Sequence, residues 1–211
     1  QTCALPIFET DRWNDYLSKA PKHTYDVEAA KALLAEAGYP DGFTCSLMIA
    51  DSSLRNSMAL AIQEQLAQIG ITVNINKVST DEHTAYQFGE KLDANGLRDY
   101  DMIMAGWEAD YPDPSGNLTP LYQGGNSSNA AAYQNDEVDK LIADQAQSSD
   151  PTQRNDDMFQ AFDIITQDVP YVFLYYPVKN IAMNKAYTGV TMNASWIWNI
   201  HFQSVHPVSE G

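Results

Sequence analysis

Apolar side chains recur at helical spacing in some stretches of the chain and alternate with polar side chains in others. Residues 26–37 show the helical spacing, with Asp26 suited to the N-cap and Gly38 to a left-handed stop. Residues 43–49 and 71–75 alternate, which predicts two strands. The helix expected between them has an apolar face made of Leu54, Met58, Ile62, Leu66 and Ile69. A strand, a helix and a strand in this order predict a right-handed βαβ unit with parallel strands.

Helical and strand patterns continue along the rest of the chain. We expect helices over 80–92, 135–147 and from 150 onward, and strands over 100–105, 171–176 and 180–184. Asp150 and Pro151 begin a capping box with proline at the first helical position. Residues 106–133 are rich in Gly, Pro, Asn and Ser, and loops of that length inside a domain are usually functional. The predicted fold class is α/β, with a helix-covered, largely parallel mixed sheet.

Composition narrows the class of partner. The 211 residues include 28 Asp and Glu against 12 Lys and Arg, which gives a net charge of −16. This charge repels phosphate backbones and anionic lipid headgroups, so we expect no nucleic acid partner, and cationic or zwitterionic small molecules fit better. The longest apolar run, 171–176, is far shorter than the roughly 18 residues that a membrane-spanning helix needs.

No sequence motif points to a metal, a cofactor or a nucleophile. The histidines match no zinc-binding pattern; they are His23, His83, His201 and His206. Cys45 has the same strand parity as its apolar neighbours and is predicted to lie in the core, and no Gly-x-Ser-x-Gly elbow or phosphate-binding loop is present. We therefore expect no metal, no cofactor and no catalytic residue.

An acidic loop follows the strand predicted over 100–105, at the strand's carboxyl end, where open α/β sheets bind their ligands. Trp107 and Asp110 could present an aromatic face and an anion to one bound molecule. Asp110 and Asp113 could also be a glycosidase-like carboxylate pair, or turn residues bonding to nearby backbone N–H groups. Two prolines and the lack of EF-hand spacing argue against calcium.

Three motifs in order resemble the C-terminal half of the family 5 extracellular solute-binding proteins, which are receptors of ABC importers. They are residues 26–43, 61–71 and 106–114, and the resemblance extends over about residues 9–207. It implies a type II periplasmic-binding-protein-like fold, in which two lobes close on a ligand. The chain would be the C-terminal lobe, incomplete without the N-terminal lobe.

The resemblance also implies site residues. In peptide-binding members the aspartate of the Gly-Trp-x-x-Asp motif holds the peptide's α-ammonium, and Asp110 matches it. Residues Gly106 to Glu108 match backbone that pairs with the peptide main chain, and Trp107 matches the aromatic residue that lines the pocket. Tyr176, or its neighbour Tyr175, would face the cleft.

By the same resemblance the protein is a receptor and not an enzyme. The implied partners are a peptide or other small solute, an ABC permease in the membrane and the N-terminal lobe, and the implied location is the periplasm or the outer face of the cell membrane. The family also contains receptors for nickel chelates and oligosaccharides. A small acidic hydrolase using Asp110 and Asp113, and an autonomous adaptor domain, are the remaining alternatives.

The expected division of the chain follows from these readings. Residues 1–7 match the translation of a sequencing adapter, CAG ACG TGT GCT CTT CCG ATC, and are interpreted as an artefact. Residues 8–25 would be a crossover segment, 26–178 the ligand-binding lobe, and 179–211 a segment returning to the N-terminal lobe. The Trp-rich stretch 196–200 has no helical or repeat pattern and would pack against that lobe.

Overall fold

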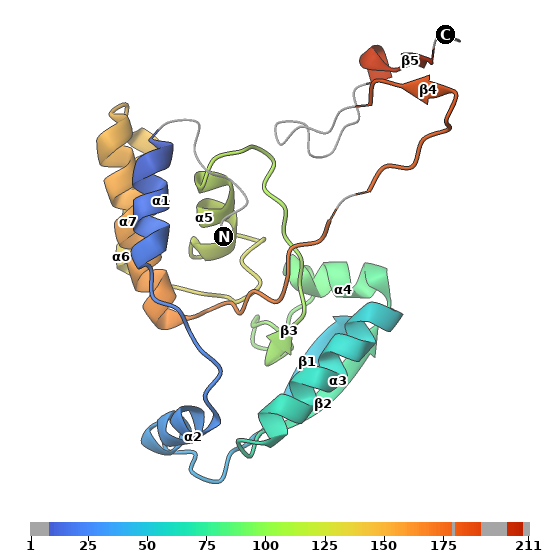
Figure 1. Cartoon of the computed structure of the whole chain (residues 1–211). Coiled ribbons are helices and arrows are strands. Elements are labelled where there is room, and N and C mark those ends of the chain that lie inside the picture. Colours follow the sequence, from blue (N-terminus) through green and yellow to red (C-terminus); the bar gives the residue numbers. More distant parts are fainter. Residues whose placement is uncertain (1–8, 179, 191–201, 209–211) are drawn as a thin grey trace. The chain divides into compact units, whose positions relative to one another are not determined.

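A computed structural model describes residues 9–178, 180–190 and 202–208 (Figure 1). The chain divides into two compact units, which we call the sheet unit and the helical unit. The sheet unit comprises residues 20–107 and 120–139, and the helical unit comprises the described parts of 1–19, 108–119 and 140–211. No helix among the residues described is long and apolar enough to cross a membrane.

The sheet unit contains a three-stranded parallel sheet. Its strands are β1 (Thr44–Ala50), β2 (Thr72–Val78) and β3 (Met102–Ile103), in the order β2-β1-β3. Helix α3 (Ser53–Ala67) connects β1 to β2, so the predicted βαβ unit with parallel strands is confirmed. Consecutive residues of β1 are buried because the strand is central and both its faces are covered; Leu47, Met48 and Ile49 are all 3 % exposed or less.

Local sequence signals set the ends of the elements around β1. Asp26 caps α2 (Val27–Glu36) by accepting a hydrogen bond from the Ala29 N–H, as predicted. The turn before β1 then approaches the end of α3, where a Cβ on Gly42 would lie 2.1 Å from the carbonyl oxygen of Gly70. Since Gly42 also has a φ of +75°, only glycine fits this close backbone contact.

Helix α4 (Thr80–Gln87) is shorter than the helix predicted over 80–92. Gly89 has a φ of +74°, and the Arg98 guanidinium lies where a Cβ on Gly89 would be. Arg98 donates to the carbonyl oxygens of Tyr86 and Gln87, at 3.0 and 3.2 Å, and this cation ends the helix. The third strand is also shorter than the predicted 100–105, because only Met102 and Ile103 pair with β1.

The helical unit is organised around α7 (Pro151–Asp168), with α1 (Thr10–Lys19) and the part of α6 (Asp136–Gln147) from Lys140 onward as further helices. Pairing of α1 with α7 is visible as the blue and orange ribbons of Figure 1. Trp13 is fully buried and packs edge-on against Phe159, with ring centroids 4.6 Å apart. Helix α1 falls within the crossover segment expected over 8–25, and the sequence pattern does not predict it because it has few apolar residues.

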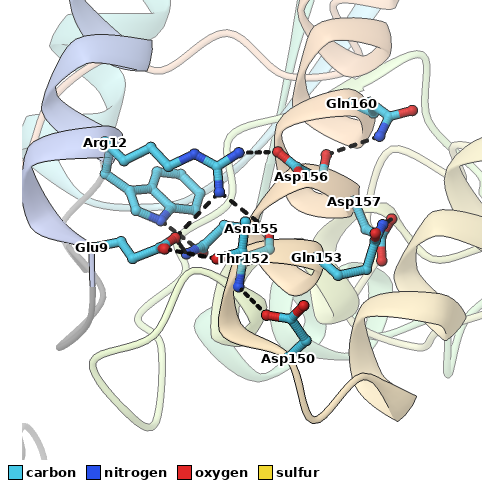
Figure 2. A network of polar contacts seen from close by, with 10 residues as sticks. Glu9, Arg12, Asp150, Thr152, Gln153, Asn155, Asp156, Asp157 and Gln160 are labelled. Atoms are coloured by element: carbon cyan, nitrogen blue, oxygen red, sulfur yellow. Dashed lines mark hydrogen bonds and ion pairs between the residues drawn. The ribbon is translucent and has the colours of Figure 1, made fainter.

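Polar contacts fix the start of α1 to the first turns of α7 (Figure 2). The Glu9 carboxylate accepts from Asn155 Nδ2, at 2.5 Å, and from Thr152 Oγ1, at 3.1 Å. The Asn155 bond, with smaller contributions from Thr152 and Arg12, holds the pKa of Glu9 below its usual value. Arg12 also pairs with Asp156 on α7.

One loop prediction and two strand predictions were wrong. Residues 106–133 are not a continuous loop, because α5 (Ser115–Tyr122) forms within them and includes Pro120. Residues 171–176 and 180–184 form no strand, and their apolar side chains are largely exposed, for example Val172 at 76 %.

Strand geometry requires a neighbour to accept the ladder hydrogen bonds, and no described segment lies against these residues as a strand. The pairing seen instead is antiparallel, between β4 (Tyr187–Thr188) and β5 (His206–Pro207). The short helix η2 (Phe202–Ser204) precedes β5. The Trp-rich stretch 196–200 lies outside the described residues.

Candidate functional site

The predicted site residues fall in both units. Gly106 and Trp107 end a segment of the sheet unit, while Glu108, Asp110 and Tyr176 belong to the helical unit. Gly106 is exposed, and its carbonyl oxygen accepts a hydrogen bond from Gln87 Nε2 on α4, at 2.9 Å. Trp107 is half-buried. The backbone predicted to meet a peptide therefore follows directly on β3 and is held by α4.

Asp110 presents an exposed carboxylate in the helical unit. The preceding residue, Ala109, is buried and touches the backbone of α5, since a Cβ on Gly116 would lie 3.2 Å from the Ala109 Cβ. Within the part of the chain that the structure describes, Asp110 makes no hydrogen bond and no ion pair. Its position is set by the packing of Ala109, and its charge is available to a cation.

Asp113 differs from Asp110 because its carboxylate is fully engaged. Arg154 on α7 donates to both oxygens, at 2.6 and 3.0 Å, and the Ser115 backbone N–H and hydroxyl donate to Oδ1 at 2.9 and 2.6 Å. Burial opposes ionisation, but the bonds from Arg154 and Ser115 outweigh it and lower the pKa of Asp113. A carboxylate held ionised in this way is a poor general acid, and the bonds to both its oxygens make it a poor nucleophile or base, so Asp113 suits neither role of a glycosidase pair.

We expect the ion pair between Asp113 and Arg154 to make the stability of the helical unit depend on pH. Because folding lowers the pKa of Asp113, its stabilisation is complete above the unfolded value near 4 and is lost as the pH falls through the folded value. Asp113→Asn should cost about 2–3 kcal/mol at pH 7 and less at pH 3, below the unfolded pKa. Thermal unfolding across this range checks the result, and an equal cost at both pH values would contradict it.

The family assignment rests on a match along most of the chain. Residues 5–129 match the model of the bacterial extracellular solute-binding proteins, family 5 middle region. The chain belongs to family 5 of the extracellular solute-binding proteins. The predicted resemblance is thus confirmed, and solved structures of relatives confirm the α/β fold of type II periplasmic binding proteins.

Named family 5 relatives show what related chains bind. The glutathione-binding protein GsiB of Salmonella paratyphi A is 34 % identical over 173 residues, which cover 78 % of this chain and 33 % of that protein. GsiB of Escherichia coli K12 is 32 % identical over the same shares of both chains. This family 5 chain therefore spans about a third of the length of the curated relatives it matches.

Two of the similar solved structures are complexes with peptides. DppA of Helicobacter pylori, in complex with the peptide STSA, is 31 % identical, with a TM-score of 0.63 over 73 % of this chain and 29 % of that one. The oligopeptide-binding protein AppA of Bacillus subtilis, in complex with a nonapeptide, is 26 % identical, with a TM-score of 0.72 over 90 % and 39 % of the two chains.

Other predicted residues of this family 5 chain have clear environments. Tyr175 and Tyr176 are about half exposed after α7, where no strand forms. Cys45 is buried in the sheet core, as predicted, and burial and then Asp101 raise the pKa of its thiol. Among the described residues, no group of three or more His, Cys, Asp or Glu side chains could hold a metal ion.

The contacts of Arg154 and of His83 were not predicted from the sequence. Arg154 lies 41 positions after Asp113, and no local pattern connects them. His83 lies on the same face of α4 as Gln87, with its Nε2 3.1 Å from the Met104 carbonyl oxygen and 3.2 Å from Arg55 Nη1. Burial, together with Arg55, lowers the pKa of His83. Two polar side chains four positions apart on a covered helix face were the available signal.

Proposed function

We propose that this chain is part of the substrate-binding component of an ABC importer that captures peptides. The observation that carries the proposal is the likeness to DppA of H. pylori, which is in complex with a peptide and 31 % identical to this chain. The net charge of −16 favours the ammonium group of a peptide and disfavours its carboxylate. The ammonium group needs an anion as its partner.

Asp110 is the proposed anchor for the peptide's α-ammonium. Its carboxylate is exposed, and it follows the Gly106–Glu108 backbone by only two positions. In the proposed complex that backbone pairs with the peptide main chain, Trp107 lines the pocket, and Tyr176 faces it. Main-chain pairing gives affinity without reading side chains, so one anchor combined with such pairing binds peptides of varied sequence.

The proposed receptor has two lobes, of which this chain provides the C-terminal one. Support comes from the share of the relatives' length, about a third, that the chain covers. Closure of the second lobe would remove Asp110 and the bound ammonium from water, which strengthens their interaction. The proposed location is the periplasm or the outer face of the membrane, where the receptor delivers its ligand to the permease.

Glutathione is the ligand favoured as the second candidate, because GsiB, a glutathione-binding protein, matches 78 % of the chain. Glutathione carries a free α-ammonium and two peptide-like bonds, so the same anchor could hold it. Chelates of nickel and oligosaccharides lack this ammonium and would leave Asp110 without its proposed partner.

Calorimetry on the complete receptor tests the function. The reading frame is first extended upstream of the Phe8 codon, where we expect a long open frame that begins with a signal peptide. Dialanine, trialanine, glutathione and N-acetyl-trialanine are then titrated. We expect at least one unblocked peptide to bind with a dissociation constant on the order of 1 μM or tighter, and acetylation to weaken trialanine by about 100-fold.

Two results would refute the proposal. A start codon with a ribosome-binding site near residue 1 would show that no second lobe is encoded upstream. Binding of an oligosaccharide or a nickel chelate, with no heat from any of the peptides, would place the protein in another ligand class of the same family.

A further inference from the structure

Two side chains of α4 hold the backbone that follows β3. His83 Nε2 lies 3.1 Å from the Met104 carbonyl oxygen, and Gln87 Nε2 donates to the Gly106 carbonyl oxygen at 2.9 Å. Four residues of a helix rise about 6 Å, and two residues of a strand span about 6.6 Å, so the two spacings match. The segment after β3 therefore runs extended along α4, with the carbonyls of Met104 and Gly106 facing the same way.

The same edge of this segment also faces β1. The Met104 N–H donates to the Met48 carbonyl oxygen at 2.9 Å, in continuation of the parallel ladder between β1 and β3. In an extended segment the N–H and carbonyl of one residue, and those of the residue two positions later, share an edge. The main chain of Gly106 thus lies on the edge that faces β1. On this edge His83 and Gln87 occupy the carbonyl oxygens to which the N–H groups of another strand would donate.

The two bonds differ in their exposure. Met104 is 7 % exposed and His83 is 3 % exposed, so that bond lies inside the unit. Gly106 is exposed, although Gln87, whose amide reaches it, is only 9 % exposed. Gly106 therefore lies at the surface beside a part-buried bond, whereas Met104 and its bond lie inside the unit.

We propose that Gln87 is a displaceable placeholder on the Gly106 carbonyl, which its amide occupies until a bound peptide's main-chain N–H takes that acceptor. The inference rests on the proposed function, because it assumes that a peptide pairs with the Gly106–Glu108 backbone. The His83 bond stays in place and keeps the segment extended in both states.

The physical basis is competition for one acceptor. A side chain of the same protein competes at a high effective concentration, so the peptide must displace or share the amide before it gains its own bond. The net free energy of one neutral hydrogen bond is small, which makes the displacement feasible. Gln87 thereby weakens every peptide that pairs with Gly106 by a similar factor and favours release to the permease.

Titration of trialanine into the complete receptor and its Gln87→Met variant tests the placeholder. Methionine keeps the length of the side chain but cannot donate to a carbonyl. We expect Gln87→Met to bind trialanine about three- to tenfold more tightly than the wild type. Equal or weaker binding by the variant, with normal binding by the wild type, would overturn the placeholder and leave the proposed function intact.

Gln63→Met is the matched control. Gln63 Nε2 donates to the Val73 carbonyl oxygen at 2.7 Å, so this variant also removes a bond from a helix glutamine to a strand carbonyl in the same unit. It should leave trialanine affinity unchanged, and an equal gain in both variants would overturn the assignment to Gln87. Failure of the wild type to bind any peptide would overturn the proposed function and the placeholder together.

A measurement on the wild type detects the displacement directly. With glutamine labelled with nitrogen-15 and the side-chain amide of Gln87 assigned by its loss in Gln87→Met, saturation with trialanine should shift that resonance and speed its exchange with water. An unchanged Gln87 amide in the peptide-bound receptor would contradict displacement.

Discussion

Asp110→Ala is expected to weaken peptide binding by roughly 3–5 kcal/mol, which is about two to three and a half orders of magnitude in the dissociation constant. The reason is that the variant leaves the peptide's α-ammonium without an anion at a site that becomes desolvated when the lobes close. Structure supports a specific role for this carboxylate, because Asp110 is exposed, whereas Asp113 three positions later is held by Arg154. Calorimetry with trialanine on the complete receptor measures the loss.

Two comparisons separate the anchor from a general effect of charge. Asp99 is also exposed, and Asp99→Ala removes the same charge from the sheet unit, so it should change affinity little. N-acetyl-trialanine has no ammonium, and its weak residual binding should be nearly the same for Asp110→Ala and the wild type. If Asp110→Ala bound trialanine normally, Asp110 would not be the anchor.

Trp13→Ala should destabilise the packing of α1 on α7 by about 3–5 kcal/mol. Trp13 is 0 % exposed, its ring packs against Phe159 and Phe162, and its Nε1 donates to Asn155 Oδ1 at 2.9 Å. The variant loses this packing and leaves Asn155 with an unpaired oxygen. Hydrogen exchange of the α7 amides, measured by mass spectrometry, should become about 100- to 3,000-fold faster.

Trp13→Phe is the matched variant for this prediction. Phenylalanine keeps an aromatic ring against Phe159 but cannot donate to Asn155, so it should show an intermediate cost. The sheet unit supplies an internal control, since amides of β1 and β2 should exchange at their normal rates in both variants. Unchanged protection of α7 in Trp13→Ala would show that α1 does not stabilise that helix.

Local patterns were sufficient for elements that combine strong periodicity with good caps. These elements are α2, β1, α3 and β2. They were predicted because their apolar spacing, N-caps and glycine stops all agree. The same patterns placed Cys45 in the core and the acidic loop after β3. The family was identified from motifs, and the match over residues 5–129 confirmed it.

Long-range contacts decided what the patterns could not predict. The residues of helix α1 give only a weak helical signal by themselves. The helix is stabilised by Trp13 and by bonds from Glu9 to α7, about 140 positions away in the sequence. The end of α4 depends on Arg98, which folds back on it. Residues 171–176 have strand-like composition but no partner strand among the described residues, and composition alone does not satisfy a backbone.

The sequence by itself determined the fold class, the family and the order of motifs that carries Asp110, because these depend on neighbours along the chain. Only the tertiary structure distinguished the exposed carboxylate of Asp110 from the arginine-bound carboxylate of Asp113, and only it placed Gln87 on the Gly106 carbonyl. Hydrogen bonds and ion pairs depend on distances between side chains, and those distances are set when separate elements pack together.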